Sequence, residues 1–344
     1  MAQSWNRRPL DAMLALAAAA SLVLSLILYA LMGGADFGGG VWDLLALGPR
    51  SAPQRTLIAK SIAPIWEANH VWLILAVVVF FTAFPTGFAA MMTALNIPVT
   101  AMLIGIVLRG SAFVFRSNDT RAGAVRRHWS TAFGVASTLT PFFQGMILGA
   151  MATGRIGVVN GQVTTGFFAG WLTPFALACG VFALVLFAFL AAVYLTLDAK
   201  GKPDLQSDFR QRAIWSGAIL VPVAGLVFLA ARHGAPEFFR GLTRWWAPWL
   251  LGATGLFSLG AIWALRRRWF AAARMAAAGQ VTLILFGWSL AQYPNLVAPD
   301  VTVLNAGAPD ATLRLLALAL GAGALVLLPS LFVLFRIFKK LPSS

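Results

Sequence analysis

Nine long apolar runs constrain this chain more than any other feature of its sequence. A helix needs about 20 mostly apolar residues to cross the hydrocarbon core of a membrane. Runs of that kind cover residues 12–32, 66–84, 88–109, 130–152, 167–195, 213–231, 247–265, 270–291 and 312–335. We therefore predict an all-α polytopic membrane protein with nine transmembrane helices.

The composition supports lipid as the solvent. Of the 344 residues, 60% are hydrophobic and 11% are charged, against roughly 25% charged in an ordinary globular domain. A formal net charge of +15 would suggest nucleic acid in a soluble protein, but here the basic residues lie in short clusters between apolar runs, so we expect no nucleic-acid partner. One cysteine and three histidines leave little material for a metal or haem site, and we expect none in this chain.

The basic residues alternate between the two sides of the predicted membrane. Cytoplasmic segments of membrane proteins are enriched in lysine and arginine. One alternate set of segments contains eighteen of them: Arg50, Arg55, Lys60, Arg116, Arg121, Arg126, Arg127, Lys200, Lys202, Arg210, Arg212, Arg266, Arg267, Arg268, Arg274, Arg336, Lys339 and Lys340. The other set includes Arg7 and Arg8 and is poorer. We therefore predict an N-terminus outside and a C-terminus in the cytoplasm.

A glycine-rich segment, residues 33–43, follows the first apolar run and contains Asp36 and Asp43. Five glycines should weaken a helix and leave backbone groups that need partners. One interpretation is a helix end packed closely by a neighbour, with both aspartates in the interface. The other is a proton-accessible Asp36, since a carboxylate at membrane depth is costly and usually functional.

A second polar segment, residues 64–72, opens the second run with Pro64 at a favourable helix start. Helical spacing places Trp66, Asn69 and His70 on one face. Glu67 is either a helix-start glutamate stabilised by the helix dipole or a proton relay, because indole neighbours reduce its hydration and favour its protonated form. For His70, a hydrogen bond to a neighbour is a simpler role than metal ligation.

Arg109 ends the third run. It lies at the same expected depth as Glu67 and Asp36 and can pair with either of them. Alternatively, it extends its side chain to the membrane surface, as long basic side chains often do.

Two further patterns concern packing. The pairs Gly34/Gly38 and Gly145/Gly149 have the four-residue spacing of small residues that lets membrane helices approach closely. The segment of about residues 291–311, rich in Pro, Asn and Asp, is predicted to lie against the helix ends.

These motifs resemble subunit II of the cytochrome bd-type quinol oxidases, the bacterial terminal oxidases that reduce oxygen to water, including their cyanide-insensitive relatives. The resemblance rests on residues 34–38 (GADFG), 66–72 (WEANHVW), 84–85 (FP), 109–110 (RG), 115–116 (FR) and 292–299 (QYPNLVAP), in that order. The order, the spacing and the nine predicted spans extend it over most of the chain.

The resemblance implies a fold and a role. The fold would be two four-helix bundles, about 12–152 and 167–291, with a peripheral ninth helix at about 312–335. The chain would sit in the bacterial inner membrane beside a haem-bearing subunit I with haems b and d, carry no haem itself, and allow a structural quinone and a small single-helix accessory subunit. Glu67 would contribute to cytoplasmic proton uptake, assisted by Asp36, with Trp66, Asn69, His70 and Arg109 in support.

Two other functions remain open at this point. A secondary transporter could use Glu67 or Asp36 as its coupling site, although transporters often have internal repeats and broken helices near the membrane midplane. A purely structural or assembly subunit would have no proton role.

Overall fold

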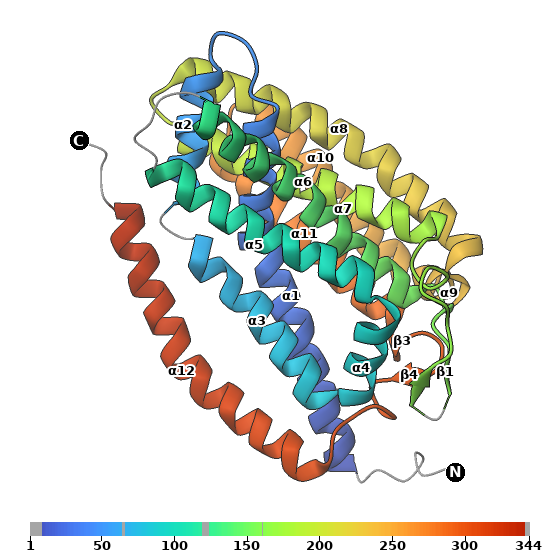
Figure 1. The fold of residues 1–344 in the computed structure, drawn as a ribbon. Helices are drawn as coiled ribbons and strands as arrows, with labels where there is room; N and C mark the ends of the chain where they lie inside the picture. Colours follow the sequence, from blue (N-terminus) through green and yellow to red (C-terminus); the bar gives the residue numbers. More distant parts are fainter. Residues whose placement is uncertain (1–8, 64–65, 119–123, 160, 341–344) are drawn as a thin grey trace.

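The protein is described by a computed structural model that covers residues 9–63, 66–118, 124–159 and 161–340 (Figure 1). Its helices are α1 (Pro9–Leu44), α2 (Ser51–Ile62), α3 (Trp66–Ala83), α4 (Pro85–Ala94), α5 (Asn96–Asn118), α6 (Ala124–Ala152), α7 (Pro174–Asp198), α8 (Pro203–Gly234), α9 (Pro236–Leu242), α10 (Ala247–Arg266), α11 (Phe270–Gln292) and α12 (Asp310–Lys340). Two antiparallel hairpins pair β1 (Val158–Val159) with β2 (Gln162–Val163) and β3 (Asn295–Val297) with β4 (Val301–Thr302). The predicted all-α class is confirmed.

Within the described residues, nine helices are long and apolar enough to cross a membrane, as predicted. The first of them extends well beyond residue 32, because α1 continues through the glycine-rich segment to Leu44. The third begins later than predicted: Phe84 and Pro85 end α3 and start the separate short helix α4, and the long helix α5 follows from Asn96.

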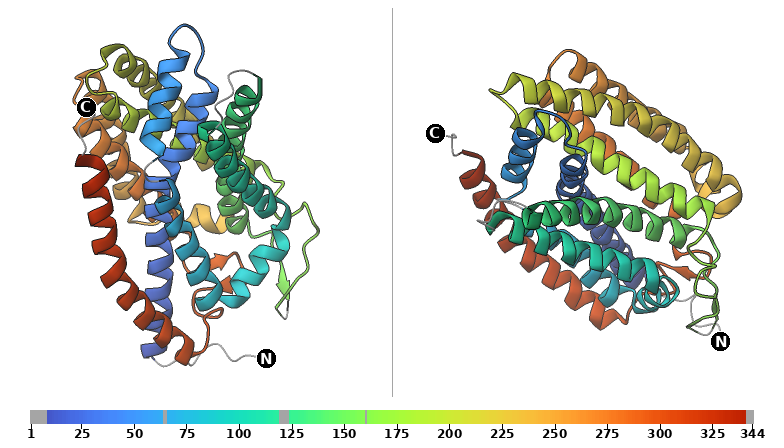
Figure 2. Two further views of the ribbon diagram at one scale, coloured as in Figure 1. Left: turned by 60° about the vertical axis from the view of Figure 1, so that its left-hand side comes forward. Right: turned by 45° about the horizontal axis from the view of Figure 1, so that its top comes forward.

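The long helices run side by side, with α2 near one end of the bundle and the two hairpins toward the other (Figure 1). Helix α7 is the most buried and packs against α1, α6, α8 and α11. Helix α12 runs along one flank (Figure 2) and packs mainly against α1 and α3, and most of its described side chains are exposed.

Small residues bring α7 close to its neighbours. A Cβ at Gly38 of α1 would overlap the carbonyl oxygen of Phe187 in α7, and one at Gly145 of α6 would overlap that of Cys179 in α7. The predicted close approach is therefore confirmed for both glycine pairs, and α7 is the shared partner.

The segment after α11 folds back on the bundle, as predicted. The Ala298 N–H donates to the carbonyl of Met151 at 3.0 Å, and the Ala308 N–H donates to that of Ala83 at 2.8 Å. The segment therefore covers the ends of α6 and α3.

Some predictions concern residues outside the described ranges. These are the helix start at Pro64 and the topological roles of Arg7, Arg8 and Arg121, as well as the side chains of Arg126, Arg127, Lys339 and Lys340.

Candidate functional site

Asp36 lies in the interior of α1, not at a helix end. Its carboxylate is 5% exposed and accepts a hydrogen bond from the Asn69 amide of α3 at 2.6 Å, between Asp36 Oδ2 and Asn69 Nδ2. The prediction that the glycine-rich segment ends the helix is wrong. Its glycines are used for close packing against neighbouring helices, and the helix continues because that packing compensates for their low propensity.

Arg109 of α5 is completely enclosed, at 1% exposure, so the alternative in which its side chain reaches the membrane surface is wrong. Its guanidinium carbon lies 4.8 Å from the ring centre of Phe37 and 5.4 Å from that of Phe133. It interacts electrostatically with Asp36 but makes no direct ion pair with it, and its Nε and Nη2 atoms have no hydrogen-bond partner among the described residues. Of the two predicted acidic neighbours, Asp36 is the one that the fold provides.

His70 extends this site along α3 through ring contacts. Its imidazole centre is 6.0 Å from the rings of Tyr29 and Phe37 and 6.3 Å from that of Trp66. The predicted hydrogen bond from His70 to a neighbour is not made within the described part of the chain. No cluster of three metal-ligating side chains occurs there either.

Glu67 occupies a different environment from Asp36. It lies in the first turn of α3 and is exposed, whereas Asn69, two residues later, is 1% exposed and faces Asp36. The fold therefore brings Asp36, Asn69, His70 and Arg109 together but leaves Glu67 on the outer surface of this chain.

A tyrosine–glutamine pair extends the polar interior deeper into the membrane. The Gln144 amide of α6 donates to the Tyr29 hydroxyl of α1 at 2.9 Å, and Gln144 Oε1 has no partner in the described structure. Both residues line an otherwise apolar cavity of about 300 Å³. Sequence reasoning missed this pair, although an isolated glutamine in an apolar run was a possible signal.

A buried ion pair was also missed. Arg116 Nη1 lies 2.9 Å from Asp43 Oδ2, with both side chains at most 8% exposed. The sequence places Arg116 in the loop after a third span that ends at residue 109, whereas in the structure it belongs to the last turns of α5.

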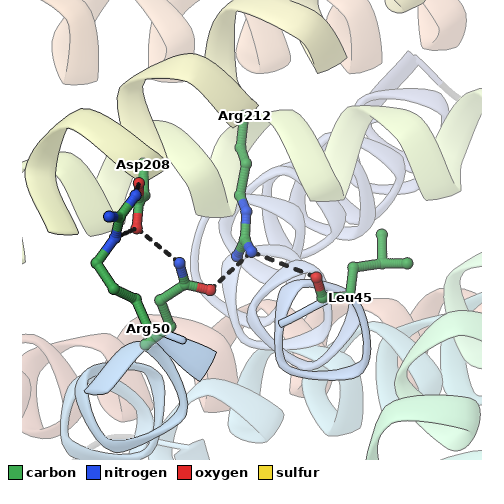
Figure 3. Close-up of polar contacts among 5 residues, drawn as sticks. Leu45, Arg50, Asp208 and Arg212 are labelled. Carbon is green, nitrogen blue, oxygen red and sulfur yellow. Dashed lines mark hydrogen bonds and ion pairs between the residues drawn. The ribbon is translucent and has the colours of Figure 1, made fainter. Parts of the chain in front are cut away.

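Near this pair, a second polar network joins α2 to α8 (Figure 3). Arg50 makes a bidentate contact with Asp208, with Nη2–Oδ1 at 2.6 Å and Nε–Oδ2 at 2.8 Å, and this contact raises the pKa of the Arg50 guanidinium. Gln54 donates to Asp208 at 2.7 Å and accepts from Arg212 at 2.7 Å, while Arg212 also donates to the carbonyl of Leu45 at 3.3 Å (Figure 3). Arg50 and Arg212, which belong to the arginines that predict the orientation in the membrane, therefore also link α2 to α8.

The family model described as cytochrome bd terminal oxidase subunit II matches residues 14–338, nearly the whole chain. This chain belongs to that family. It is a membrane-spanning subunit of a respiratory quinol oxidase, and membership favours this role over the transporter interpretation.

Individual relatives give the same result. The chain is 27% identical over 303 residues to the cytochrome bd ubiquinol oxidase subunit 2 of Bacillus subtilis, covering 86% of each chain. It is 29% identical over 187 residues to the cytochrome bd-I ubiquinol oxidase subunit 2 of Escherichia coli, covering 53% of this chain and 48% of that protein. The solved bd oxidase of Geobacillus thermodenitrificans has a chain with the same fold, with a TM-score of 0.75 and 22% identity over 95% of this chain and 98% of that one.

Proposed function

We propose that this chain acts as the non-haem subunit II of an electrogenic ubiquinol:oxygen oxidoreductase, in which it supports a haem-bearing subunit I and contributes to cytoplasmic proton uptake. The observation that carries the proton role is the buried Asp36 carboxylate, bonded to the neutral Asn69 amide and not paired directly with Arg109. A carboxylate held by a neutral partner can accept a proton without breaking an ion pair.

Helix α3 supports a route between an exposed and a buried acid. Its first turn presents Glu67 outward, while Asn69 and His70 of the same turn face α1. We place Glu67 at the entrance, Asp36 at the inner end, and Asn69, His70, Arg109 and Trp66 as the groups that position them.

The chemistry requires such a route. Reduction of one oxygen molecule to two waters consumes four protons. If those protons come from the cytoplasm and quinol releases its own outside, the reaction separates charge. This assignment depends on the predicted orientation, with the N-terminus outside and the C-terminus in the cytoplasm of a bacterial inner membrane.

The Tyr29–Gln144 cavity fits a structural quinone. Gln144 donates to the Tyr29 oxygen, which leaves the Tyr29 hydroxyl proton to donate to a quinone carbonyl, and the remaining lining is apolar. Haems b and d are assigned to subunit I. The two four-helix bundles with a peripheral ninth helix, and a small single-helix accessory subunit, also belong to this proposal.

Purification of the native complex through a tag on this chain tests the assembly. We expect a haem-bearing subunit to co-purify and a reduced-minus-oxidised spectrum to contain b-type and d-type bands. A colourless preparation containing a single kind of subunit, with no oxygen consumption, would refute the assignment.

The variant Glu67→Gln tests the proton role within the assembled complex. We expect oxygen consumption to fall severalfold at normal haem content, because glutamine cannot take up a proton. Glu237→Gln is the matched control: Glu237 is the other glutamate of the chain, and it contacts Arg240 and Asn295 in and beside α9. Unchanged turnover in Glu67→Gln would remove Glu67 from the route, whereas loss of haem would indicate a role in assembly.

A further inference from the structure

The turn between α10 and α11 gathers basic side chains at the end of two membrane-spanning helices. Helix α10 ends at Arg266 and α11 begins at Phe270. We call Arg266, Arg267 and Arg268 of this turn, together with Arg274 in the next turn of α11, the arginine turn. The three consecutive arginines are exposed, and Arg274 is half-buried.

None of these arginines has an acidic partner among the residues that the structure describes. Across the described ranges, no ion pair links any of the four to a carboxylate. Arg50 and Arg212 differ from them, because Arg50 pairs with Asp208 and Arg212 donates a hydrogen bond to Gln54 (Figure 3). The arginine turn is therefore an uncompensated positive patch.

The end of α10 does not need these guanidinium groups as caps. Its last carbonyls accept backbone bonds: Trp263 from the Arg267 N–H at 3.0 Å, and Ala264 from the Trp269 N–H at 2.8 Å. The Leu265 carbonyl accepts from Arg210 Nε of α8 at 2.7 Å. The donors of the arginine turn are thus left for a ligand outside the chain.

Aromatic rings hold part of the patch in place. The Trp263 and Trp269 rings meet edge to face at 4.9 Å, and the Arg267 guanidinium lies 6.0 Å from the Trp263 ring centre. Arg274 stacks 4.3 Å from the Tyr194 ring centre. Tryptophans at the end of a membrane helix mark the level of the lipid headgroups, so the cations lie where phosphates of the bilayer are found.

Apolar surface continues from the patch into the membrane. Leu256 and Leu259 of α10 and Met275 of α11 are each at least 70% exposed. A ligand that matches both parts has an anionic phosphate head and long apolar chains.

We propose that the arginine turn is a binding site for the headgroup of an anionic phospholipid, with the acyl chains lying on α10 and α11. Two or more unpaired guanidinium groups suit phosphate oxygens, which they contact in forked geometry. The site is independent of the proposed proton role and of the assigned orientation, because it requires only that the turn lies at a membrane surface.

Native mass spectrometry of the purified, delipidated complex titrated with cardiolipin tests this site. The variant Arg266→Gln/Arg267→Gln/Arg268→Gln should raise the cardiolipin concentration for half-occupancy at least about tenfold, since each arginine near a lipid surface contributes roughly a fivefold effect. The matched control is Arg155→Gln/Arg232→Gln/Arg244→Gln, which removes the same charge from exposed arginines at the opposite helix ends. It should leave the titration unchanged.

Three results would overturn the proposal. One is an unchanged titration in the arginine-turn variant. Another is an equal loss in the control, which would indicate a general charge effect. The third is competition by inorganic phosphate as strong as that by cardiolipin, which would indicate a site for free phosphate. If the triple variant does not assemble, Arg267→Gln alone should weaken binding about fivefold, and no change there would equally refute the site.

Discussion

Two aspartates of α1 and two arginines of α5 form two levels of the same interior, and the levels differ. Asp36 and Asp43 are seven residues apart in α1, as are Arg109 and Arg116 in α5. At the Asp43 level the charges meet directly at 2.9 Å. At the Asp36 level the carboxylate accepts a hydrogen bond from the Asn69 amide, and Arg109 Nε and Nη2 have no hydrogen-bond partner among the described residues.

The difference separates a structural pair from a candidate functional one. Phe133 of α6 contacts both guanidinium groups, at 5.4 Å from Arg109 and 4.6 Å from Arg116, so the aromatic surroundings are shared. A direct ion pair favours the charged state of both partners. A carboxylate held by a neutral amide keeps both protonation states available, which a proton route requires.

The largest expected effect follows from breaking the Asp43–Arg116 ion pair. The variant Arg116→Met leaves a buried Asp43 without its partner and should lower the free energy of unfolding by about 3–5 kcal/mol. The double variant Asp43→Leu/Arg116→Met should recover most of that loss. Thermal unfolding of the purified complex measures both, and a double variant as unstable as the single one would contradict the ion-pair explanation.

Removal of Arg109 should lower the free energy of unfolding less than removal of Arg116. The variant Arg109→Met removes a buried charge whose Nε and Nη2 have no hydrogen-bond partner in the described part of the chain. The lost interactions are therefore partly offset by the removed desolvation penalty, and we expect the free energy of unfolding to fall by about 1–2 kcal/mol. The same unfolding measurement compares it with Arg116→Met. Equal losses would show that the two levels are energetically equivalent in the complex.

Oxygen consumption should depend on Asp36 more than on Asp43, whereas stability depends more on the Asp43–Arg116 pair. Asp36→Asn preserves shape but cannot take up a proton, so we expect oxygen consumption to fall about tenfold, a barrier increase of about 1.4 kcal/mol, at normal haem content. Asp43→Asn should reduce stability while each assembled complex keeps its turnover. Similar turnover in the two variants would remove the functional distinction.

The smallest effect is expected at the exposed ion pair of the α2–α8 network. Arg50 is 56% exposed in its contact with Asp208, and exposed ion pairs contribute little to stability because water and salt screen them. Arg50→Gln should therefore shift thermal unfolding only slightly, and the shift should disappear at high salt. A loss as large as that of Arg116→Met would show that the α2–α8 contact holds the molecule together.

The helices were largely predictable, and the exceptions have a physical reason. Apolar runs located nine spans because lipid requires each helix to satisfy its own backbone. The continuation of α1 through residues 33–43 was missed, since local glycine content argues against a helix and only the close packing against α7 reverses that preference. The separate helix α4 was missed because an apolar run does not reveal a break between a short helix and the long helix that follows it.

The residues of the candidate site were identified from the sequence, but their arrangement was not. The sequence identified Asp36, Asn69, His70 and Arg109, and the electrostatic interaction of Arg109 with Asp36 was one of its alternatives. It did not show that Asn69 would bond to Asp36 or that Glu67 would face outward. It also missed the Asp43–Arg116 pair, because partners on different helices leave no spacing signal in the chain.

The sequence by itself determined that the protein lies in lipid, how many helices span the membrane and which family it belongs to. Hydropathy and local motifs can be read within single helices, so these properties need no knowledge of how the helices pack. The tertiary structure alone decided which carboxylate is buried beside a neutral amide, which is neutralised by an arginine and which stays on the surface. Those outcomes depend on how helices distant in sequence rotate and approach one another, which is set by side-chain packing among several helices at once.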